Sequence, residues 1–185
     1  DAVEILTQVA DENEFIELKS DYGTDMAIGF IRLDGETVGC VANKEEKIST
    51  QGAKKAASFV KLCDAFGVGI LTFTDVTGYA ADLEQEKELA QAVGTMTGAF
   101  VQASVPKVNV ITKKAFGSAY VFMNSKAVGA DLVYAWEDTK IGMMEADMAA
   151  KIMNPGADAD VLKEKAQEYE KLQSDVESAA RRGYV

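Results

Sequence analysis

Residues 105–122 read VPKVNVITKKAFGSAYVF, and this stretch determines how the rest of the chain is interpreted. The Val, Ile and Thr residues of KVNVITK (107–113) predict a buried strand. Pro106 disfavours helical geometry at the residue before it, so we expect a helix over about 84–104 to end there. Gly117 then opens another short helix. A helix, a buried strand and a second helix in this order are typical of α/β proteins.

The segments on the N-terminal side extend this pattern. GILTFTDV (69–76) predicts a second buried strand. Two apolar runs, 26–33 and 37–42, flank Asp34-Gly35, which is a strong hairpin signal. We also expect short strands near 15–18, 131–136 and 139–144, and helices at 1–11, 50–66, 145–153, 158–171 and 174–182. A hairpin followed by βα units, without linker or internal repeat, predicts a single α/β domain.

The composition is that of an ordinary globular protein. The 185 residues are 48% hydrophobic and 26% charged, which excludes a disordered or low-complexity chain. The net charge of −11 disfavours binding to nucleic acid or to an anionic membrane. No apolar run approaches the roughly 20 residues of a membrane helix, and no signal peptide is visible. We therefore expect a cytoplasmic protein without membrane insertion.

Several catalytic chemistries are excluded by the residues that the sequence lacks. The chain contains no histidine, which removes Ser-His-Asp and Cys-His catalysis and any imidazole base. Its two cysteines, Cys40 and Cys63, form no CxxC motif, so zinc-finger and thioredoxin chemistry are disfavoured. Each lies in an apolar segment, which predicts a buried, reduced thiol. We expect no metal site.

Two junctions between a strand and a helix are the candidates for chemistry. The first is FTDVTGY (73–79), and the second is KKAFGSAY (113–120). A glycine after a buried strand permits close approach of the backbone to a ligand, and the first N–H groups of a helix have no intrahelical partner. Two such junctions can supply the backbone donors of an oxyanion hole. The alternative is that both glycines serve turns only.

Four segments carry a resemblance to a known family. They are FIRLDGETVGCVAN (30–43), LTFTDVTGYAAD (71–82), VPKVNVITKKAFGSAY (105–120) and KIGMMEADMAAKIM (140–153). The chain resembles the carboxyltransferase subunits of biotin-dependent acyl-CoA carboxylases, such as propionyl-CoA carboxylase β, and their decarboxylase relatives. Those subunits have two crotonase-like domains in tandem. Residues 1–185 resemble the C-terminal one, so the resemblance implies that the N-terminal carboxyltransferase domain is absent from this chain.

The resemblance implies a fold, ligands and partners. The fold is an α/β, crotonase-like ββα spiral. The cofactor is biotin on a biotin carboxyl carrier protein, the substrate is an acyl-CoA, and no metal is involved. The partner domain is the N-terminal carboxyltransferase domain of a neighbouring subunit, within a homo-oligomer. In this family carboxybiotin delivers its carboxylate to the α-carbon of the thioester, and backbone dipoles replace acid–base side chains.

The resemblance also assigns site residues. The backbone N–H groups of Ser118 and Ala119, after Gly117, correspond to the family's donors to the biotin ureido oxygen. Gly78 and Tyr79 lie in the facing loop and, with Val121, are the cofactor-binding residues that the resemblance implies. Val121 corresponds to the position that selects acyl-chain size.

The chain departs from the family pattern at several of these positions. The usual DVPGF reads DVTGY, with Thr77 in place of Pro, and the usual GGAY reads GSAY, with Ser118 in place of Gly. Ser118 keeps its N–H but adds a side chain where a ligand must approach. The usual WP reads Trp136-Glu137.

Other residues have both structural and functional interpretations. We expect Asp75 to position its loop through an Asx-type bond, Lys113 and Lys114 to be solvated, and Trp136 to pack in the core. The functional alternatives are contact with a ligand, with CoA phosphates, or with a biotin channel. Met143, Met144, Met148 and Met153 suit either a core or an interface. We expect the domain to expose an apolar face that a larger assembly buries, and two segments are the candidates for it: 143–153 and the set Ala90, Val93, Met96, Ala99 and Phe100.

Three functions are compatible with these patterns. The first is the biotin-side domain of a carboxyltransferase for a short acyl-CoA, working in carboxylation or in methylmalonyl- or glutaconyl-CoA decarboxylation. The second is a stand-alone crotonase-like hydratase or thioesterase, which needs a Glu or Asp base in its pocket. The third is a non-catalytic assembly or docking domain.

Overall fold

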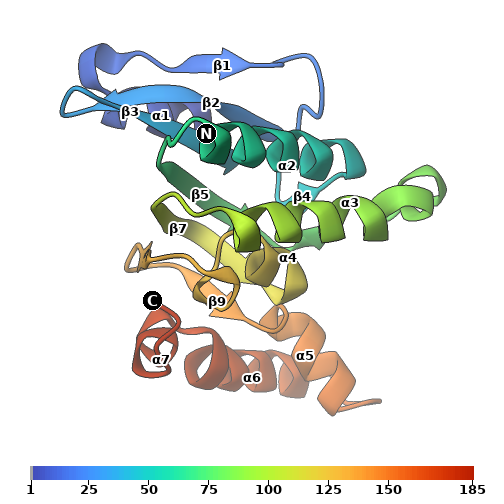
Figure 1. The fold of residues 1–185 in the computed structure, drawn as a ribbon. Helices are drawn as coiled ribbons and strands as arrows, with labels where there is room; N and C mark the ends of the chain where they lie inside the picture. The colour runs from blue at the N-terminus through green and yellow to red at the C-terminus, as the bar shows by residue number, and fades with distance from the viewer. Residues whose placement is uncertain (1) are drawn as a thin grey trace.

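The computed structural model describes residues 2–185 as a mixed α/β protein (Figure 1). Within these residues, seven strands form one sheet in the order β1-β2-β3-β5-β7-β8, and β9 also pairs with β7. The strands are β1 (Ile16–Leu18), β2 (Met26–Leu33), β3 (Glu36–Asn43), β5 (Ile70–Val76), β7 (Lys107–Phe116), β8 (Leu132–Ala135) and β9 (Lys140–Gly142). The first three are antiparallel, and β3, β5, β7 and β8 are parallel, with β9 also parallel to β7. This confirms the α/β prediction.

Helices cover both faces of the sheet. They are α1 (Ala2–Val9), α2 (Thr50–Ala65), α3 (Leu83–Gln102), α4 (Gly117–Phe122), α5 (Ala146–Met153), α6 (Ala159–Tyr169) and α7 (Val176–Arg181). In Figure 1, α2, α3 and α4 lie in front of the sheet, and α5 to α7 continue beyond β9. Successive side chains of β3 point to opposite faces of the sheet. Val41 belongs to the main core under α2, and Cys40 belongs to a smaller core that includes Leu6 of α1.

Local signals in the sequence explain the element boundaries. Asp34 and Gly35 both have positive φ, 52° and 82°, as a two-residue turn of type I′ requires. The Ser49 side chain caps α2 by accepting from Gly52 N, and Asp82 caps α3. The helix predicted at 84–104 is α3, and it ends before Pro106 as expected. The helix predicted at 1–11 is observed as α1, and its first residue, Asp1, lies outside the described residues.

Three features were not predicted. β7 continues three residues beyond Lys113, because its second half changes partner and pairs with β9. β4 (Lys47–Ile48) and β6 (Gly78–Tyr79) form a separate two-stranded sheet. A π turn, η3 (Glu170–Ser174), follows α6. All three lie around the end of β7, where the candidate site is found.

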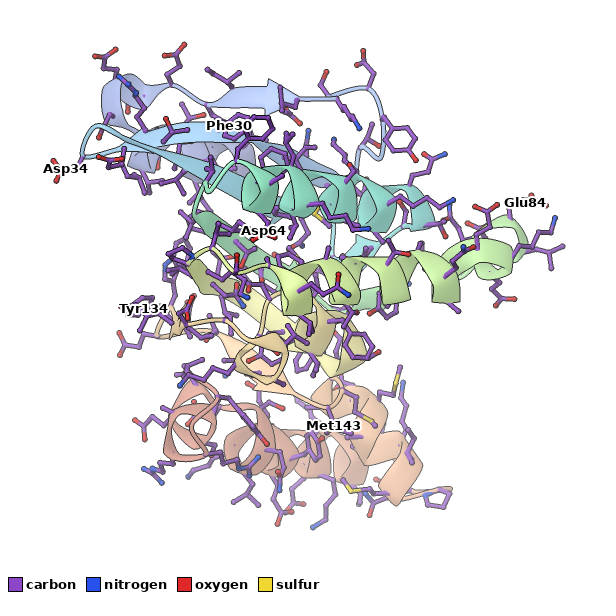
Figure 2. The ribbon with its side chains drawn as sticks, in the orientation of Figure 1. Phe30, Asp34, Asp64, Glu84, Tyr134 and Met143 are labelled. Atoms are coloured by element: carbon purple, nitrogen blue, oxygen red, sulfur yellow. The ribbon has the colours of Figure 1, made fainter. Side chains whose placement is uncertain are left out.

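Two burial predictions are wrong. Trp136 does not pack in the core, because it follows the edge strand β8 and remains 44% exposed. The set proposed as a second exposed face is mostly interior: Val93, Met96, Ala99 and Phe100 of α3 are buried against the sheet and α2, and only Ala90 is exposed. In the other proposed face, Met143, Met148 and Met153 are exposed (Met143 is labelled in Figure 2). Both cysteines are buried and free, as predicted.

No helix among residues 2–185 combines the length and apolar character that crossing a membrane requires.

Candidate active site

The end of β7 and the start of α4 form the centre of the site. Gly117 lies at φ +60°, in the left-handed region that favours glycine, and turns the chain from strand to helix. A Cβ added there would be 3.2 Å from the carbonyl oxygen of Met143. No side chain of residues 2–185 caps α4, and helix geometry leaves the N–H groups of Ser118 and Ala119 without an intrahelical acceptor. The structure therefore has a glycine turn and a helix start at this junction, and the role of these N–H groups as donors to a ligand stays a prediction.

The second predicted junction faces the first. After β5, the backbone N–H of Thr77 donates to Glu46 O at 2.7 Å, and the N–H of Ala80 donates to Ile48 O at 2.9 Å. These bonds fix β6 beside β4, and α4 packs on β6. Tyr79 packs its ring against the main core next to Ser118. Gly78 has open space where a side chain would be. The structure therefore places Gly78 and Tyr79 beside the α4 junction.

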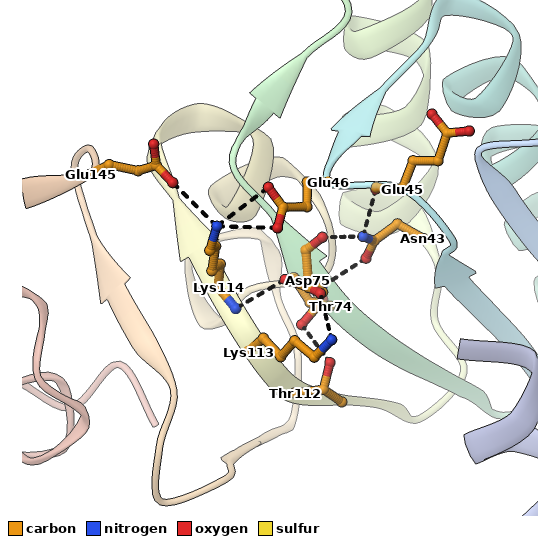
Figure 3. A network of polar contacts seen from close by, with 9 residues as sticks. All are labelled: Asn43, Glu45, Glu46, Thr74, Asp75, Thr112, Lys113, Lys114 and Glu145. Carbon is orange, nitrogen blue, oxygen red and sulfur yellow. Dashed lines mark hydrogen bonds and ion pairs between the residues drawn. The ribbon is translucent and has the colours of Figure 1, made fainter. Parts of the chain in front are cut away.

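Asp75 holds the strand ends together (Figure 3). Its backbone N–H donates to Asn43 Oδ1 at 2.8 Å, its carbonyl accepts from Asn43 Nδ2, and its Oδ1 accepts from Lys114 N at 3.2 Å. These contacts span β3, β5 and β7 where the β5–β7 register shifts after Thr74. Asp75 therefore has the structural role that we expected, but it acts through Asn43 and the next strand and not through an Asx-type bond.

The two lysines before the junction differ. Lys113 is exposed, with its Nζ 4.0 Å from Asp75 Oδ2, which agrees with the solvated role predicted for it. Lys114 is not simply solvated. Its Nζ lies 3.1 Å from Glu46 Oε1 and 3.3 Å from Glu145 Oε1, and these hydrogen bonds, that to Glu46 first, raise its pKa (Figure 3). Lys114 thus connects the segment before β4 to the start of α5.

A cavity of about 440 Å³ opens beside the junction, between α4, β9 and the C-terminal helices. Gly117, Ser118 and Val121 line it, together with aromatic residues and two cationic residues. The aromatic residues are Tyr120, Phe122, Tyr169 and Tyr184, and the cationic ones are Lys126 and Arg182. Ala119, in contrast, is fully buried in the core and is not among the residues that line the cavity. Gly78 and Tyr79 do not line this cavity; they lie next to it.

The charged groups of the cavity are already engaged. Lys126 Nζ donates to Gly183 O at 3.1 Å, and Arg182 donates to Gln173 Oε1 at 2.9 Å and to Leu172 O at 3.2 Å. Burial raises the pKa of Tyr120 to about 12, so its hydroxyl stays protonated at neutral pH. No carboxylate is among the residues found to line the cavity within 2–185. The cavity therefore offers hydrogen-bond donors but no general base.

Comparison with known proteins gives the family. The model of the family described as carboxyl transferase domain matches residues 1–185. This chain belongs to that family. The carboxyl transferase domain is 38% identical over 192 residues to the propionyl-CoA carboxylase beta chain of Cereibacter sphaeroides, covering 100% of this chain and 38% of that protein. It is 39% identical over 159 residues to the human mitochondrial propionyl-CoA carboxylase beta chain, covering 83% and 30%.

Solved structures confirm the fold of the carboxyl transferase domain. A transcarboxylase 12S hexamer, with methylmalonyl-coenzyme A and methylmalonic acid bound, superposes with a TM-score of 0.95 at 31% identity, covering 99% of this chain and 37% of that one. The beta subunit of geranyl-CoA carboxylase from P. aeruginosa shares the fold with a TM-score of 0.91 at 24% identity, covering 100% and 37%. The crotonase-like fold implied by the sequence is thereby confirmed. The chain spans less than two-fifths of the length of these proteins.

Proposed function

We propose that this chain is the C-terminal, biotin-side domain of an acyl-CoA carboxyltransferase that moves a carboxyl group between carboxybiotin and a short acyl-CoA. One observation carries the proposal. The start of α4, where the first N–H groups have no intrahelical acceptor, borders a mostly apolar cavity that Gly117 and Ser118 line. An apolar cavity with donors at one end fits a ring that carries a single acceptor oxygen, such as the ureido ring of biotin.

The residues of the site hold the ligand and polarise its acceptor oxygen, and no proton transfer by a side chain is required. When bound, carboxybiotin supplies the carboxyl group that is transferred. The N–H groups of Ser118 and Ala119 would donate to the ureido oxygen, where negative charge increases as the carboxyl group leaves. Fixed backbone dipoles in a site shielded from water stabilise such charge without reorganisation. Asp75 and Asn43 keep the strand ends in register, so the donors keep their direction.

The absence of a base among the lining residues counts against a stand-alone hydratase. Hydration of an enoyl-CoA needs a carboxylate or another base within hydrogen-bond reach of a water molecule. No carboxylate is among the residues of 2–185 found to line the cavity, and the raised pKa of Tyr120 keeps its hydroxyl protonated at neutral pH. Hydration of crotonyl-CoA by the chain alone would favour the hydratase over the carboxyltransferase.

The proposed partners are those that the resemblance to the carboxyltransferase family implies. We propose that an N-terminal carboxyltransferase domain of a neighbouring subunit binds the acyl-CoA and that a biotin carboxyl carrier protein delivers biotin. The exposed methionines Met143, Met148 and Met153 are candidates for a contact between subunits within a homo-oligomer.

The test compares the 185-residue chain with a protein that also carries an N-terminal carboxyltransferase domain. Malonyl-CoA or methylmalonyl-CoA is supplied with free biotin to the 185-residue chain, to a protein carrying both domains, and to a mixture of separate domains. We expect no turnover by the chain alone and biotin-dependent turnover by the two-domain protein. Appreciable turnover by the chain alone, or turnover independent of biotin by the two-domain protein, would contradict the proposal.

A further inference from the structure

The short helix α4 needs support from outside itself. It has six residues, Gly117–Phe122, and no side chain in the described part of the chain caps its start. A helix of this length is unstable alone, because few of its backbone groups find a partner within it. Ala119, Tyr120 and the capping residue Met123 pack it onto the core, but apolar packing has no preferred direction. The direction of α4 must therefore come from contacts with fixed geometry.

Asn124, which lies two residues after α4, makes such contacts. Its Nδ2 donates to Thr72 Oγ1 of β5 at 3.1 Å and to Val108 O of β7 at 3.2 Å. The side chains of Asn124 and Thr72 are fully buried. These bonds tie the C-terminal end of α4 to two central strands, while β7 continues directly into its N-terminal end. The helix is thus held at both ends.

The acceptor on β5 is itself held in place. Thr72 Oγ1 donates to Asn109 Oδ1 at 2.8 Å, and Thr74 Oγ1 donates to the same oxygen at 2.8 Å. Thr72, Thr74 and Asn109 are fully buried on the neighbouring strands β5 and β7. Buried hydrogen bonds that form a network reinforce one another. Asn124 therefore attaches α4 to a well-fixed part of the sheet.

Asn124 bears two energetic costs. Its φ of +55° lies in the left-handed region, which asparagine tolerates better than most residues but only glycine adopts freely. Its Oδ1 is buried and has no hydrogen-bond partner within residues 2–185. Native proteins rarely keep a buried polar atom unpaired, and backbone strain is often found at functional sites. Glycine would avoid both costs, so the Nδ2 donor is what this position gains from asparagine.

We propose that Asn124 is a positioning residue, which sets the direction of α4 and so the place of the Ser118 and Ala119 N–H groups beside the cavity. Asn124 is buried and is not among the residues that line the cavity, so it acts through α4. The proposal rests on the proposed function, which gives these N–H groups the role of donors to the ureido oxygen of biotin. Without the Asn124 amide, α4 can tilt about Gly117. A displacement of about 1 Å in an active site can cost on the order of 100-fold in rate.

Amide NMR spectra of the 185-residue chain without ligand test the positioning. Asn124→Gly removes the side chain and keeps a residue that accepts positive φ. We expect the amide resonances of Ser118 and Ala119 to show some of the largest shifts outside residues 122–126. Thr72→Val, which removes the acceptor hydroxyl and keeps the shape, should shift the same two amides in the same direction. Thr72→Ser keeps the hydroxyl and should shift them much less.

Asn154→Ala is the matched control. Asn154 also follows a helix directly, α5, and its Nδ2 donates to Ala150 O at 3.0 Å. Its loss should leave the Ser118 and Ala119 amides in place.

Two outcomes would overturn the positioning. If Asn124→Gly and Thr72→Val leave both amides unmoved, α4 keeps its direction without Asn124. If Asn154→Ala shifts them as much, the response reports general loosening of the fold and not the contact of Asn124. Should Asn124→Gly fail to fold, the comparison of Thr72→Val with Thr72→Ser decides by the same criterion.

Steady-state kinetics of the two-domain protein with free biotin test the consequence for the reaction. Asn124→Gly should lower kcat/KM for biotin by about 10- to 100-fold at a temperature where the protein is folded. Adding Thr72→Val should cause little further loss, because both changes break the same contact. The KM for methylmalonyl-CoA should not change, since the acyl-CoA is proposed to bind the N-terminal domain. Gly35→Ala, in the distant hairpin turn, should keep normal activity.

The two experiments separate the positioning from the function. If the spectra show that α4 moves but kcat/KM for biotin is unchanged, the direction of α4 does not matter for the reaction and Asn124 is only structural. If the wild-type two-domain protein shows no dependence on biotin, the proposed function fails, while the spectra still decide whether Asn124 directs α4.

Discussion

Substitution of Gly117 by alanine should damage both stability and activity, because two independent constraints meet at this residue. Its φ of +60° is a conformation that costs an L-residue about 1–2 kcal/mol. The added Cβ would also lie 3.2 Å from Met143 O, a backbone atom that cannot rotate away. We therefore expect a loss of at least about 1–2 kcal/mol, which for a chain of this size lowers the thermal midpoint by roughly 2–8 °C.

The effect on activity should be larger than the effect on stability. To relieve the contact, the start of α4 must move relative to β9, and the N–H groups of Ser118 and Ala119 move with it. Loss of one oxyanion donor typically costs about 100- to 1000-fold in rate. The assay is biotin-dependent turnover of methylmalonyl-CoA by the two-domain protein, at a temperature where the variant is fully folded by circular dichroism.

Gly35→Ala is the matched control. Gly35 also has positive φ, 82°, but a Cβ there meets nothing within 4 Å. This variant should show the conformational cost alone and normal activity, because Gly35 lies in the hairpin turn far from the site. If Gly117→Ala kept near-normal turnover while Gly35→Ala lost the same stability, the junction would not be the site of transfer.

Three further results are expected. Ser118→Val should lower the rate of biotin-dependent turnover by about 100- to 1000-fold with the fold intact, because the valine side chain obstructs the approach of the ligand to the backbone donors. Near-normal turnover would show that the site is misplaced. Stability should fall from about pH 9 to pH 12, since burial raises the pKa of Cys40 to about 12 and the unfolded chain releases that proton near pH 9. Urea midpoints measured across this range should decline less steeply in Cys40→Ala. The chain should self-associate in sedimentation at moderate salt, and Met143→Lys with Met148→Lys should weaken that association; a monomer in both proteins would remove the case for a methionine contact.

The elements of the fold could be predicted because their signals are local. Asp34-Gly35, Pro106 and the capping residue Asp82 each act within a few residues, and the observed boundaries follow them. The extension of β7 could not be predicted, because two consecutive lysines, Lys113 and Lys114, usually mark the end of a strand. In the structure, the second half of β7 pairs with β9, and Lys114 lies opposite Lys140, which is 26 positions later in the chain.

Burial was harder to predict than secondary structure. The sequence makes the apolar residues of α3 a candidate for an exposed face. In the structure α3 packs against α2, and that contact depends on where the two helices cross. Residue type alone predicts that Trp136 packs in the core. Its exposure follows from its place after β8, which forms one edge of the main sheet, and no sequence pattern reports which strand is at the edge.

The candidate site was predicted in part. The junction at Gly117–Ala119 could be found from a glycine after a buried strand and from the resemblance to the family. The residues that complete the site could not, because they come from distant segments. Asn43 ends a hairpin strand, Glu46 lies in a charged loop, and Arg182 follows the last helix, so none had a local signal.

The most direct test of the biotin-side assignment is the response of the backbone amides to biotin. Uniformly ¹⁵N-labelled chain would be titrated with free biotin and with its diamine derivative, which lacks the ureido carbonyl, while amide resonances are followed by NMR. We predict that biotin causes the largest shifts at the N–H groups of Ser118 and Ala119, and that the diamine does not shift them. If these two amides are unmoved while others respond, or if the diamine shifts them equally, the donors at this junction do not bind the ureido oxygen.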